Sequence, residues 1–466
     1  MLQRLIQRPN CLLNVRNRHQ FLTALLASLS LVNLMAISHG IGVGWLSPTL
    51  RKLQSQDSPV GFTLDVNEIS WVGAMLGLGA VTGNILLGCL IGRLGSKLCL
   101  LFLAFPNTCF WLLVYFAESV EYLFVARLLA GISSGGMYIV HPIFLSEISS
   151  ANIRGTLSSM LMLYMNMGVL LGYILATHLP YFLITWLVIC CPIAYFLSVL
   201  LFVKESPMHL IRKGRVTEAY KSFRYYKNIK DDDHEMNNEF ETMRIALTKG
   251  NQLKDGLTLR DFCTPAAVKA YGIGLVLIMT NQFSCLFPMI NYMSDIFAQS
   301  GSAMDPNFCS IIIGAVQILG TYGTTLLCDI CGRKLLLLVS TAGVTVSLTA
   351  FGFFTHYAGI YDLREWSWVP LVLMSLYIFL GNIGLIGCFF VCLVEIFPLK
   401  IRAKAASIAI VLTSCVVSLL LLIFPLCLAH WGISATMWSC AGITGGGFCF
   451  LLPFLKETKG KSMLDD

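Results

Sequence analysis

Charged residues are scarce in this chain. Asp, Glu, Lys and Arg together make up 12% of its 466 residues, whereas 56% are hydrophobic. A soluble domain typically has about twice that share of charge. The scarcity therefore excludes an ordinary soluble globular domain and indicates a protein that lies in a lipid bilayer.

Clusters that would hold a metal or carry covalent chemistry are also missing. The seventeen cysteines are scattered through apolar runs, and the one Cys-x-x-Cys, at Cys328 and Cys331, has no second pair or histidine close by. The eight histidines show no ligand spacing, and no nucleophile–base pair emerges. We therefore expect no metal, no other cofactor and no enzymatic activity.

The net charge of +7 does not indicate a nucleic-acid partner. The one long polar segment, residues 204–265, mixes both signs, with Asp231 to Asp233 beside Lys227 and Lys230. Elsewhere the basic residues sit between apolar runs, which is typical of charges that orient a membrane protein.

What the chain has instead is about twelve apolar runs of ~20 residues each, which predict an all-α membrane protein. The predicted spans are 20–46, 69–92, 97–117, 122–145, 156–178, 182–203, 267–297, 307–328, 334–356, 368–394, 403–429 and 433–455. One side of these spans receives Arg93, Lys97, Arg154, Arg333, Lys334, Lys400, Arg402, Lys404 and residues 204–265. The other side receives Arg51, Lys52 and Arg364, with Arg127 at a helix edge. This asymmetry predicts that both termini are cytosolic.

The chain is built twice. Glu147 and Arg154 recur as Glu395 and Arg402 at one offset (395 − 147 = 248 and 402 − 154 = 248). Gly95-Ser96-Lys97 returns as Gly332-Arg333-Lys334, and Lys204-Glu205-Ser206 returns as Lys456-Glu457-Thr458. Duplicated halves around a central site are the plan of many transporters. We therefore predict two pseudo-symmetric six-helix halves.

The repeat and the polar segment divide the chain into five parts. These are a cytosolic N-terminus (1–19), an N-terminal bundle (20–203), a cytosolic linker with short helices (204–265), a C-terminal bundle (266–455) and a cytosolic tail (456–466).

Charged residues at the cytosolic helix ends are candidates for a gate. In a membrane such charges must pair or reach water. Placed symmetrically, they could form ion pairs between the halves that break when the cytosolic side opens. The alternative is that they serve only to orient the chain. The candidates are Arg93, Glu147, Arg154, Asp329, Arg333, Glu395 and Arg402.

Several motifs resemble the sugar transporters of the major facilitator superfamily. The stretch LAGISSGGMYIVHPIFLSEISSANIR resembles the family signature, with Gly131, Gly135, Phe144, Glu147 and Arg154 at the family spacing. Asp329 to Lys334, Lys204 to Pro207, Glu395 to Arg402 and Lys456 to Ser462 resemble further family motifs, in the family order. The general layout is similar to arthropod facilitated trehalose and hexose carriers. The resemblance implies the major facilitator fold.

The resemblance also implies a sugar site in mid-membrane, between the halves. Asn281-Gln282-Phe283-Ser284 resembles the family's Gln-Gln-x-Ser, and Gln317 stands where the family often has an amide. Thr413, Ser414 and Phe390 are further candidates. A neutral amide inside a span is costly unless it has a partner or faces a cavity. The alternative role for the amides is to hold helices together.

Other positions depart from the family pattern. Met162 and Phe287 stand where the family has a glutamine and an asparagine, Gly92 replaces an acid, and Gly387 to Phe390 lacks the usual prolines and tryptophan. We expect facilitative transport of a hexose or trehalose by a monomer in the plasma membrane. The alternative is a transport-poor sugar sensor or a carrier of a different small solute.

Proton coupling is not expected. Sugar–proton symporters of the superfamily carry an acid in the first helix, but Phe21 to Trp45 contains no Asp or Glu. His39 is the one titratable group of that kind there, and a local packing role suits it better than proton exchange. The sequence therefore predicts a uniporter.

Overall fold

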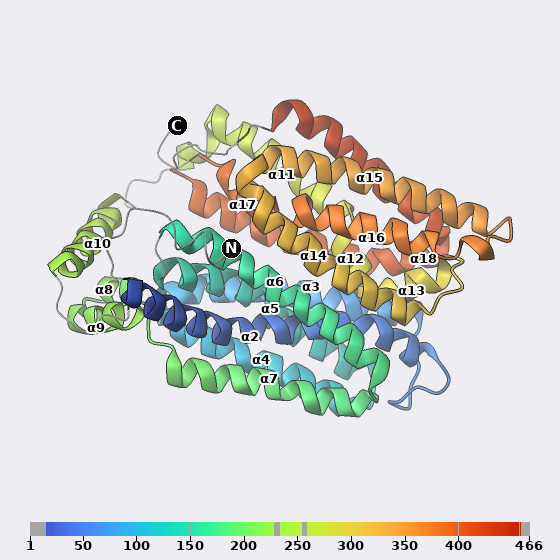
Figure 1. Cartoon of the computed structure of the whole chain (residues 1–466), viewed down its shortest axis with the longest axis horizontal. Helices are drawn as coiled ribbons and strands as arrows, with labels where there is room; N and C mark the ends of the chain where they lie inside the picture. The colour runs from blue at the N-terminus through green and yellow to red at the C-terminus, as the bar shows by residue number, and fades with distance from the viewer. Residues whose placement is uncertain are drawn as a thin grey trace.

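The computed structural model describes residues 15–148, 151–227, 234–253, 259–398, 400–455 and 457, and these residues form helices joined by turns, with no strand among them. Backbone groups in a bilayer must find partners within their own segment, and helices meet this requirement. In Figure 1 the blue-to-green helices form one layer and the yellow-to-red helices lie against it as a second layer.

The first half is a bundle of six long helices. They are α2 (Val15–Gln54), α3 (Val66–Leu94), α4 (Ser96–Tyr115), α5 (Val120–Ile148), α6 (Ala151–His178) and α7 (Tyr181–Phe202). Helix α3 begins at a capping box, in which Asp65 accepts from the Glu68 backbone and Glu68 accepts from the Asp65 backbone.

Three short helices follow the first bundle. They are α8 (Pro207–Arg212), α9 (Val216–Lys227) and α10 (His234–Leu253), and they lie together at one end of the molecule (Figure 1). Leu210, Ala219, Phe223 and Phe240 form their small apolar core. We call this end of the molecule, which also carries Arg93 and Arg333, the basic end.

The second half contains the more interrupted helices. They are η2 (Leu259–Cys263), α11 (Pro265–Phe283), α12 (Leu286–Asn291), α13 (Met293–Gln299), α14 (Pro306–Cys331), α15 (Arg333–Ala358), η3 (Arg364–Trp366), α16 (Val369–Gly381), η4 (Asn382–Ile386), α17 (Phe389–Glu395) and α18 (Arg402–Phe454).

Two predicted spans are broken where we expected continuous helices. The span 267–297 divides between α11 and α12 at Cys285, which has the left-handed φ of +58°. The span 368–394 contains the π-helix η4, in which Asn382 to Ile386 wind in a wider turn than an α-helix. Helix α18 covers the last two predicted spans and bends between them at Gly432, where φ is +76°.

The lengths and compositions of the helices agree with a multi-pass membrane protein. Ten described helical stretches are long and apolar enough to cross a bilayer. Two of them, Pro265–Asn291 and Val369–Glu395, contain the breaks just described, and another is the 51-residue stretch of α18 that bends at Gly432. Helix α2 carries the first predicted span, 20–46. Large apolar side chains such as Phe105, Leu201 and Val346 are exposed on the outer surface, as expected for contact with lipid.

Glycines let two pairs of helices in the first half approach closely. A Cβ added at Gly83 of α3 would lie 2.2 Å from the carbonyl oxygen of Ile132 in α5, and one at Gly131 would lie 2.2 Å from that of Leu76. Helices α2 and α6 meet in the same way, through Gly40 and Gly168. In lipid the hydrophobic effect does not hold helices together. Small residues stabilise helix contacts there because they allow close van der Waals packing.

Gly83→Ala should therefore destabilise the protein, because its methyl group would collide with backbone that cannot turn away. Overpacking of this kind costs about 1–3 kcal/mol, so the melting temperature of the detergent-purified chain should fall by several degrees. Gly92→Ala is the matched control, since it lies in the same helix and a Cβ there meets nothing within 4 Å. Equal melting temperatures for the two variants would contradict the close contact.

Candidate functional site

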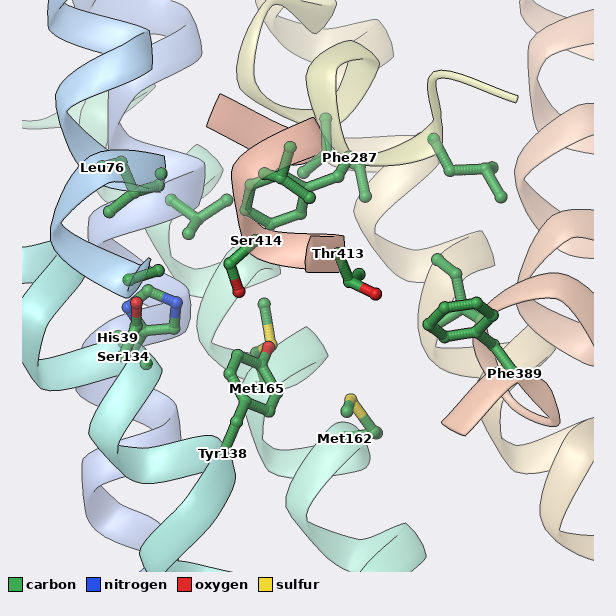
Figure 2. Close-up of a pocket in the computed structure, with 18 of the residues that line it drawn as sticks. His39, Leu76, Ser134, Tyr138, Met162, Met165, Phe287, Phe389, Thr413 and Ser414 are labelled. Carbon is green, nitrogen blue, oxygen red and sulfur yellow. The ribbon is translucent and has the colours of Figure 1, made fainter. Parts of the chain in front are cut away.

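A cavity of about 160 Å³ lies between the two halves. The first half contributes residues of α2, α3, α5 and α6, and the second half contributes residues of α11, α12, α14, η4, α17 and α18. Figure 2 shows side chains from both halves converging, with the hydroxyl group of Ser414 directed into the space between them. A largely apolar pocket with a few polar groups is the usual form of a small-molecule site.

All five candidate solute contacts line this cavity: Asn281, Gln282, Gln317, Phe390 and Thr413. The structure thus brings together residues from α11, α14, α17 and α18 that are up to 132 positions apart (413 − 281 = 132).

The adjacent amides Asn281 and Gln282 of α11 form a short chain of hydrogen bonds. Gln282 Nε2 donates to Asn281 Oδ1 at 2.7 Å, and Asn281 Nδ2 donates to the carbonyl oxygen of Leu385 at 2.6 Å. Leu385 belongs to η4, so these bonds connect the end of α11 to the π-helix. Asn281 therefore holds helices together, and it also lines the cavity.

Further polar residues on the cavity wall were missed from the sequence. They are His39, Asn84, Ser134, Tyr138 and Asn166. Ser414, a further candidate from the sequence, also lines the cavity. Asn84 and Asn166 are neutral amides inside apolar helices, and the cost of burying such a group, which singled out Gln282, would have found them too. Tyr138 carries no such signal, because tyrosines are common in spans.

The rest of the wall is apolar, and no Asp, Glu, Lys or Arg is among the described residues that line it. Met162 and Phe287, two of the positions that depart from the family pattern, both face the cavity. A charged solute would therefore meet no opposite charge on this wall.

Two aromatic rings from opposite halves stack at the part of the wall toward the basic end. The rings of Tyr138 (α5) and Phe390 (α17) lie 6.2 Å apart, centroid to centroid, at an angle of 23°. Tyr138 Oη also bonds Met165 Sδ at 2.8 Å. This stack joins the halves by one pair of rings.

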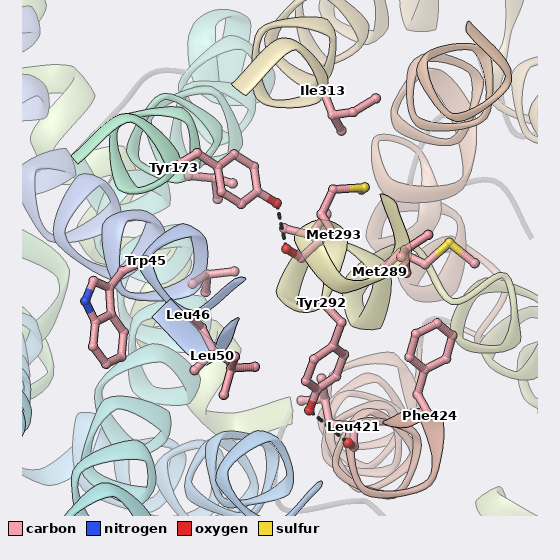
Figure 3. Close-up of a cluster of buried hydrophobic side chains, with 14 of the residues drawn as sticks. Trp45, Leu46, Leu50, Tyr173, Met289, Tyr292, Met293, Ile313, Leu421 and Phe424 are labelled. Atoms are coloured by element: carbon pink, nitrogen blue, oxygen red, sulfur yellow. Dashed lines mark hydrogen bonds between the residues drawn. The ribbon is translucent and has the colours of Figure 1, made fainter. Parts of the chain in front are cut away.

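The end opposite the basic end is closed by a much larger contact between the halves. Figure 3 shows Leu46 and Leu50 of α2 facing α12 and α13, while Trp45 points the other way and packs on Phe110, Trp111 and Tyr181 of its own half. Tyr173 of α6 donates to the carbonyl oxygen of Ile290 at 2.6 Å, and Ser47 of α2 donates to Ser294 at 3.1 Å. The molecule is therefore sealed on this side of the cavity.

Arg127 lies inside this closed end, which corrects its expected place at a helix edge. Its side chain is 1% exposed. Its guanidinium donates to the carbonyl oxygens of Gly42 at 3.1 Å and Val72 at 3.4 Å, and to Asn291 Oδ1 at 3.2 Å. One cation thus connects α2, α3 and α5 with α12 of the other half through neutral acceptors.

The gate candidates lie at the basic end, where the described ion pairs do not join one half to the other. Glu147 accepts from Ser96 Oγ at 2.8 Å and pairs with Arg212 of α8 at 3.6 Å. Glu395 Oε2 is buried without a partner, and Arg402 Nε donates to the carbonyl oxygen of Phe397 at 3.0 Å. Arg93 is exposed at the end of α3. The side chains of Arg154 and Asp329 lie outside the described residues.

The other repeated motifs meet in pairs at this end. Glu205 accepts from the backbone N–H groups of Ser96 at 2.9 Å and Lys97 at 3.2 Å. Glu457 accepts in the same way from Arg333 and Lys334, both at 3.1 Å. Each carboxylate thus satisfies free N–H groups at a helix start, where a negative charge is favoured. Arg333 supplies its backbone to this cap, while its Nε is buried without a partner.

A membrane carrier built from two six-helix halves around a central cavity is the class that this fold and site define. The profile of the sugar (and other) transporter family matches residues 37–465. The chain belongs to this family.

Its relatives agree with that assignment. A facilitated trehalose transporter of Bombyx mori is 30% identical over 444 residues, covering 95% of this chain and 85% of the relative. One of Aedes aegypti is also 30% identical, but this chain spans only 54% of its length. The inward-open structure of the xylose transporter XylE of E. coli has a TM-score of 0.75 at 20% identity, over 94% of this chain and 98% of that one, and shows the major facilitator fold.

Asn291→Leu should loosen the closed end, because it removes the one acceptor that Arg127 finds in the second half. Leaving a buried donor without its acceptor costs about 1–3 kcal/mol. We expect faster amide hydrogen exchange in α12 and α13 of the purified protein.

Asn107→Leu is the matched control for this variant. Asn107 is an equally buried amide whose oxygen accepts from Ser38, within the first half. Unchanged exchange in α12 and α13 of Asn291→Leu, or the same increase in Asn107→Leu, would refute the role of this contact.

Proposed function

We propose that this protein is a facilitative sugar carrier that works by alternating access. The observation that carries the proposal is the cavity between the halves, lined by amides and aromatic rings, in a chain of the sugar (and other) transporter family. Amides offer hydrogen bonds to hydroxyl groups, and aromatic faces suit the apolar side of a sugar ring. The trehalose carriers among its relatives make a hexose or trehalose the solute to test first.

The organisation expected from the sequence completes the proposal. The basic end is the cytosolic end, so both termini are cytosolic. The chain acts as a monomer in the plasma membrane, with bundles at 20–203 and 266–455, cytosolic segments at 1–19 and 456–466, and the linker at 204–265. The exposed apolar side chains on the long helices support contact with lipid.

Asn281, Gln282, Gln317, Phe390 and Thr413 are the proposed solute contacts. Arg93, Glu147, Arg154, Asp329, Arg333, Glu395 and Arg402 form the proposed cytosolic gate, which pairs across the halves when the opposite end opens. Glu395 Oε2, buried without a partner while that end is closed, supports a pairing that exists in another state.

A second candidate is a transport-poor sensor or a carrier of a more apolar solute. The observation that favours it is the apolar surface that Met162 and Phe287 present to the cavity. Uptake of radiolabelled trehalose, D-glucose and a non-sugar control in transporter-null cells separates the two. Saturable uptake of a sugar supports the carrier, and its absence at normal surface expression supports the alternative.

Gln282→Ala should raise the half-saturation concentration of that uptake roughly tenfold, since a hydrogen bond lost in a dry site costs about 1–3 kcal/mol. Gln54→Ala, at an exposed glutamine of α2, is the matched control. An unaltered half-saturation concentration in Gln282→Ala, with normal surface expression, would remove Gln282 from the site.

We further propose that transport is not coupled to protons. The described wall of the cavity contains no carboxylate, and Arg127 binds neutral acceptors. His39 is the one histidine on that wall.

Proteoliposomes under an imposed proton gradient should therefore equilibrate the sugar without accumulating it. Wild type and His39→Ala should respond alike to the gradient. Concentrative uptake that collapses with a protonophore and disappears in His39→Ala would overturn the uniporter.

A further inference from the structure

Asn84 of α3 lies where the two halves meet, and its amide is half satisfied. Its side chain lines the cavity and is 3% exposed. Nδ2 donates to Ser414 Oγ of α18 at 2.8 Å, across the seam between the halves. Oδ1 is buried without a hydrogen-bond partner.

The orientation of this amide follows from the hydroxyl group that it meets. Ser414 Oγ donates its single proton to the carbonyl oxygen of Ile410 at 3.2 Å. In this arrangement the hydroxyl proton goes to the Ile410 carbonyl, so the hydroxyl oxygen accepts from Asn84 Nδ2. The free group of Asn84 is therefore its acceptor oxygen.

Gln317 of α14, in the other half, repeats this arrangement. Its Nε2 donates to Asn166 Oδ1 at 2.8 Å, and Asn166 Nδ2 donates to Thr321 Oγ1 at 2.6 Å. Thr321 donates its proton to the backbone carbonyl oxygen of Gln317 at 2.9 Å. The chain of donors again ends on a carbonyl, so Gln317 Oε1 is left over, buried without a partner on a side chain that is 2% exposed.

Two buried acceptor oxygens, one from each half, are thus unsatisfied on residues that line one cavity. Each amide nitrogen keeps a second proton, but it already makes one bond, whereas neither oxygen accepts any. Buried polar groups in folded proteins nearly always have a partner, and an orphaned one calls for a ligand or water. These two acceptor oxygens therefore require hydrogen-bond donors from a bound molecule.

We propose that Asn84 is a solute-binding residue, and that Asn84 Oδ1 and Gln317 Oε1 each accept a hydrogen bond from a hydroxyl group of the bound solute. This inference rests on the proposed carrier function and adds to it a criterion for which solutes the site binds. One solute then bonds both halves at once, through α3 and α14.

This criterion excludes several classes of solute. A carboxylate or phosphate brings only acceptor oxygens and would be repelled by these two. An ammonium group could donate, but no carboxylate among the described wall residues compensates its charge. Neutral solutes with at least two hydroxyl groups remain, and the apolar remainder of the wall suits their carbon skeleton.

Binding to the purified full-length wild type tests the direction of the hydrogen bonds without any variant. Thermal stabilisation is measured with D-glucose and trehalose, and then with the monodeoxy and deoxyfluoro analogues of whichever binds more tightly. Fluorine replaces the hydroxyl oxygen but donates nothing. We expect at least two positions where the deoxy and deoxyfluoro analogues both lose about tenfold in affinity. Deoxyfluoro analogues that bind as the parent sugar does at every position would overturn the proposal.

Asn84→Leu then assigns one of these positions. The variant should bind the parent sugar about tenfold more weakly than wild type. For one monodeoxy analogue, which lacks the hydroxyl group that Asn84 contacts, variant and wild type should have equal affinities. Asn33→Leu, at a buried amide of α2 that does not line the cavity, is the control and should leave the whole pattern of analogues unchanged. A uniform loss across all analogues in Asn84→Leu would refute its contact with the solute. A wild type that binds neither sugar would instead overturn the proposed function itself, and this inference with it.

Discussion

A polar group that is withdrawn from water into the apolar interior of this protein must find its partner inside the protein. The backbone meets this requirement by forming helices almost everywhere. Arg127 meets it by gathering three acceptors from three helices, one of them in the other half. The amides around the cavity meet it only in part, since their nitrogens are bonded and two of their oxygens are not. The candidate binding site is thus the place where two buried amide oxygens still lack a hydrogen-bond partner.

The same requirement explains why the two ends of the molecule differ. The closed end joins the halves through apolar side chains, neutral hydrogen bonds and one buried cation. At the basic end the described ion pairs stay within a half or join it to a linker helix, and their basic partners, Arg212 and Lys400, are exposed to water. A contact that must open and close repeatedly can use charges in this way, because water replaces the partner when the contact breaks.

Much of the fold could be predicted because apolar runs of sufficient length specify spans and the repeated motifs specify two halves. The breaks could not, since Cys285 and the π-turn at Asn382 lie within runs whose composition does not change. The family resemblance, supported by the cost of a buried amide, identified Gln282 and Gln317, whereas Asn84, which carries the same cost, was missed because no motif drew attention to it. Arg127 was misplaced because the start of a helix in sequence does not tell which of its faces turns inward.

The two helix caps at the basic end bear on the order in which the protein is assembled. In each half the capping carboxylate comes after the sixth span, Glu205 after α7 and Glu457 after α18, and it closes on a loop far earlier in the same half. A chain that emerges from the ribosome can therefore complete every contact of this kind in the first half before α11 is made. The second half must wait for its last span. Each half thus contains everything its own cap needs, and the cavity, which takes residues from both halves, requires the second half to be finished.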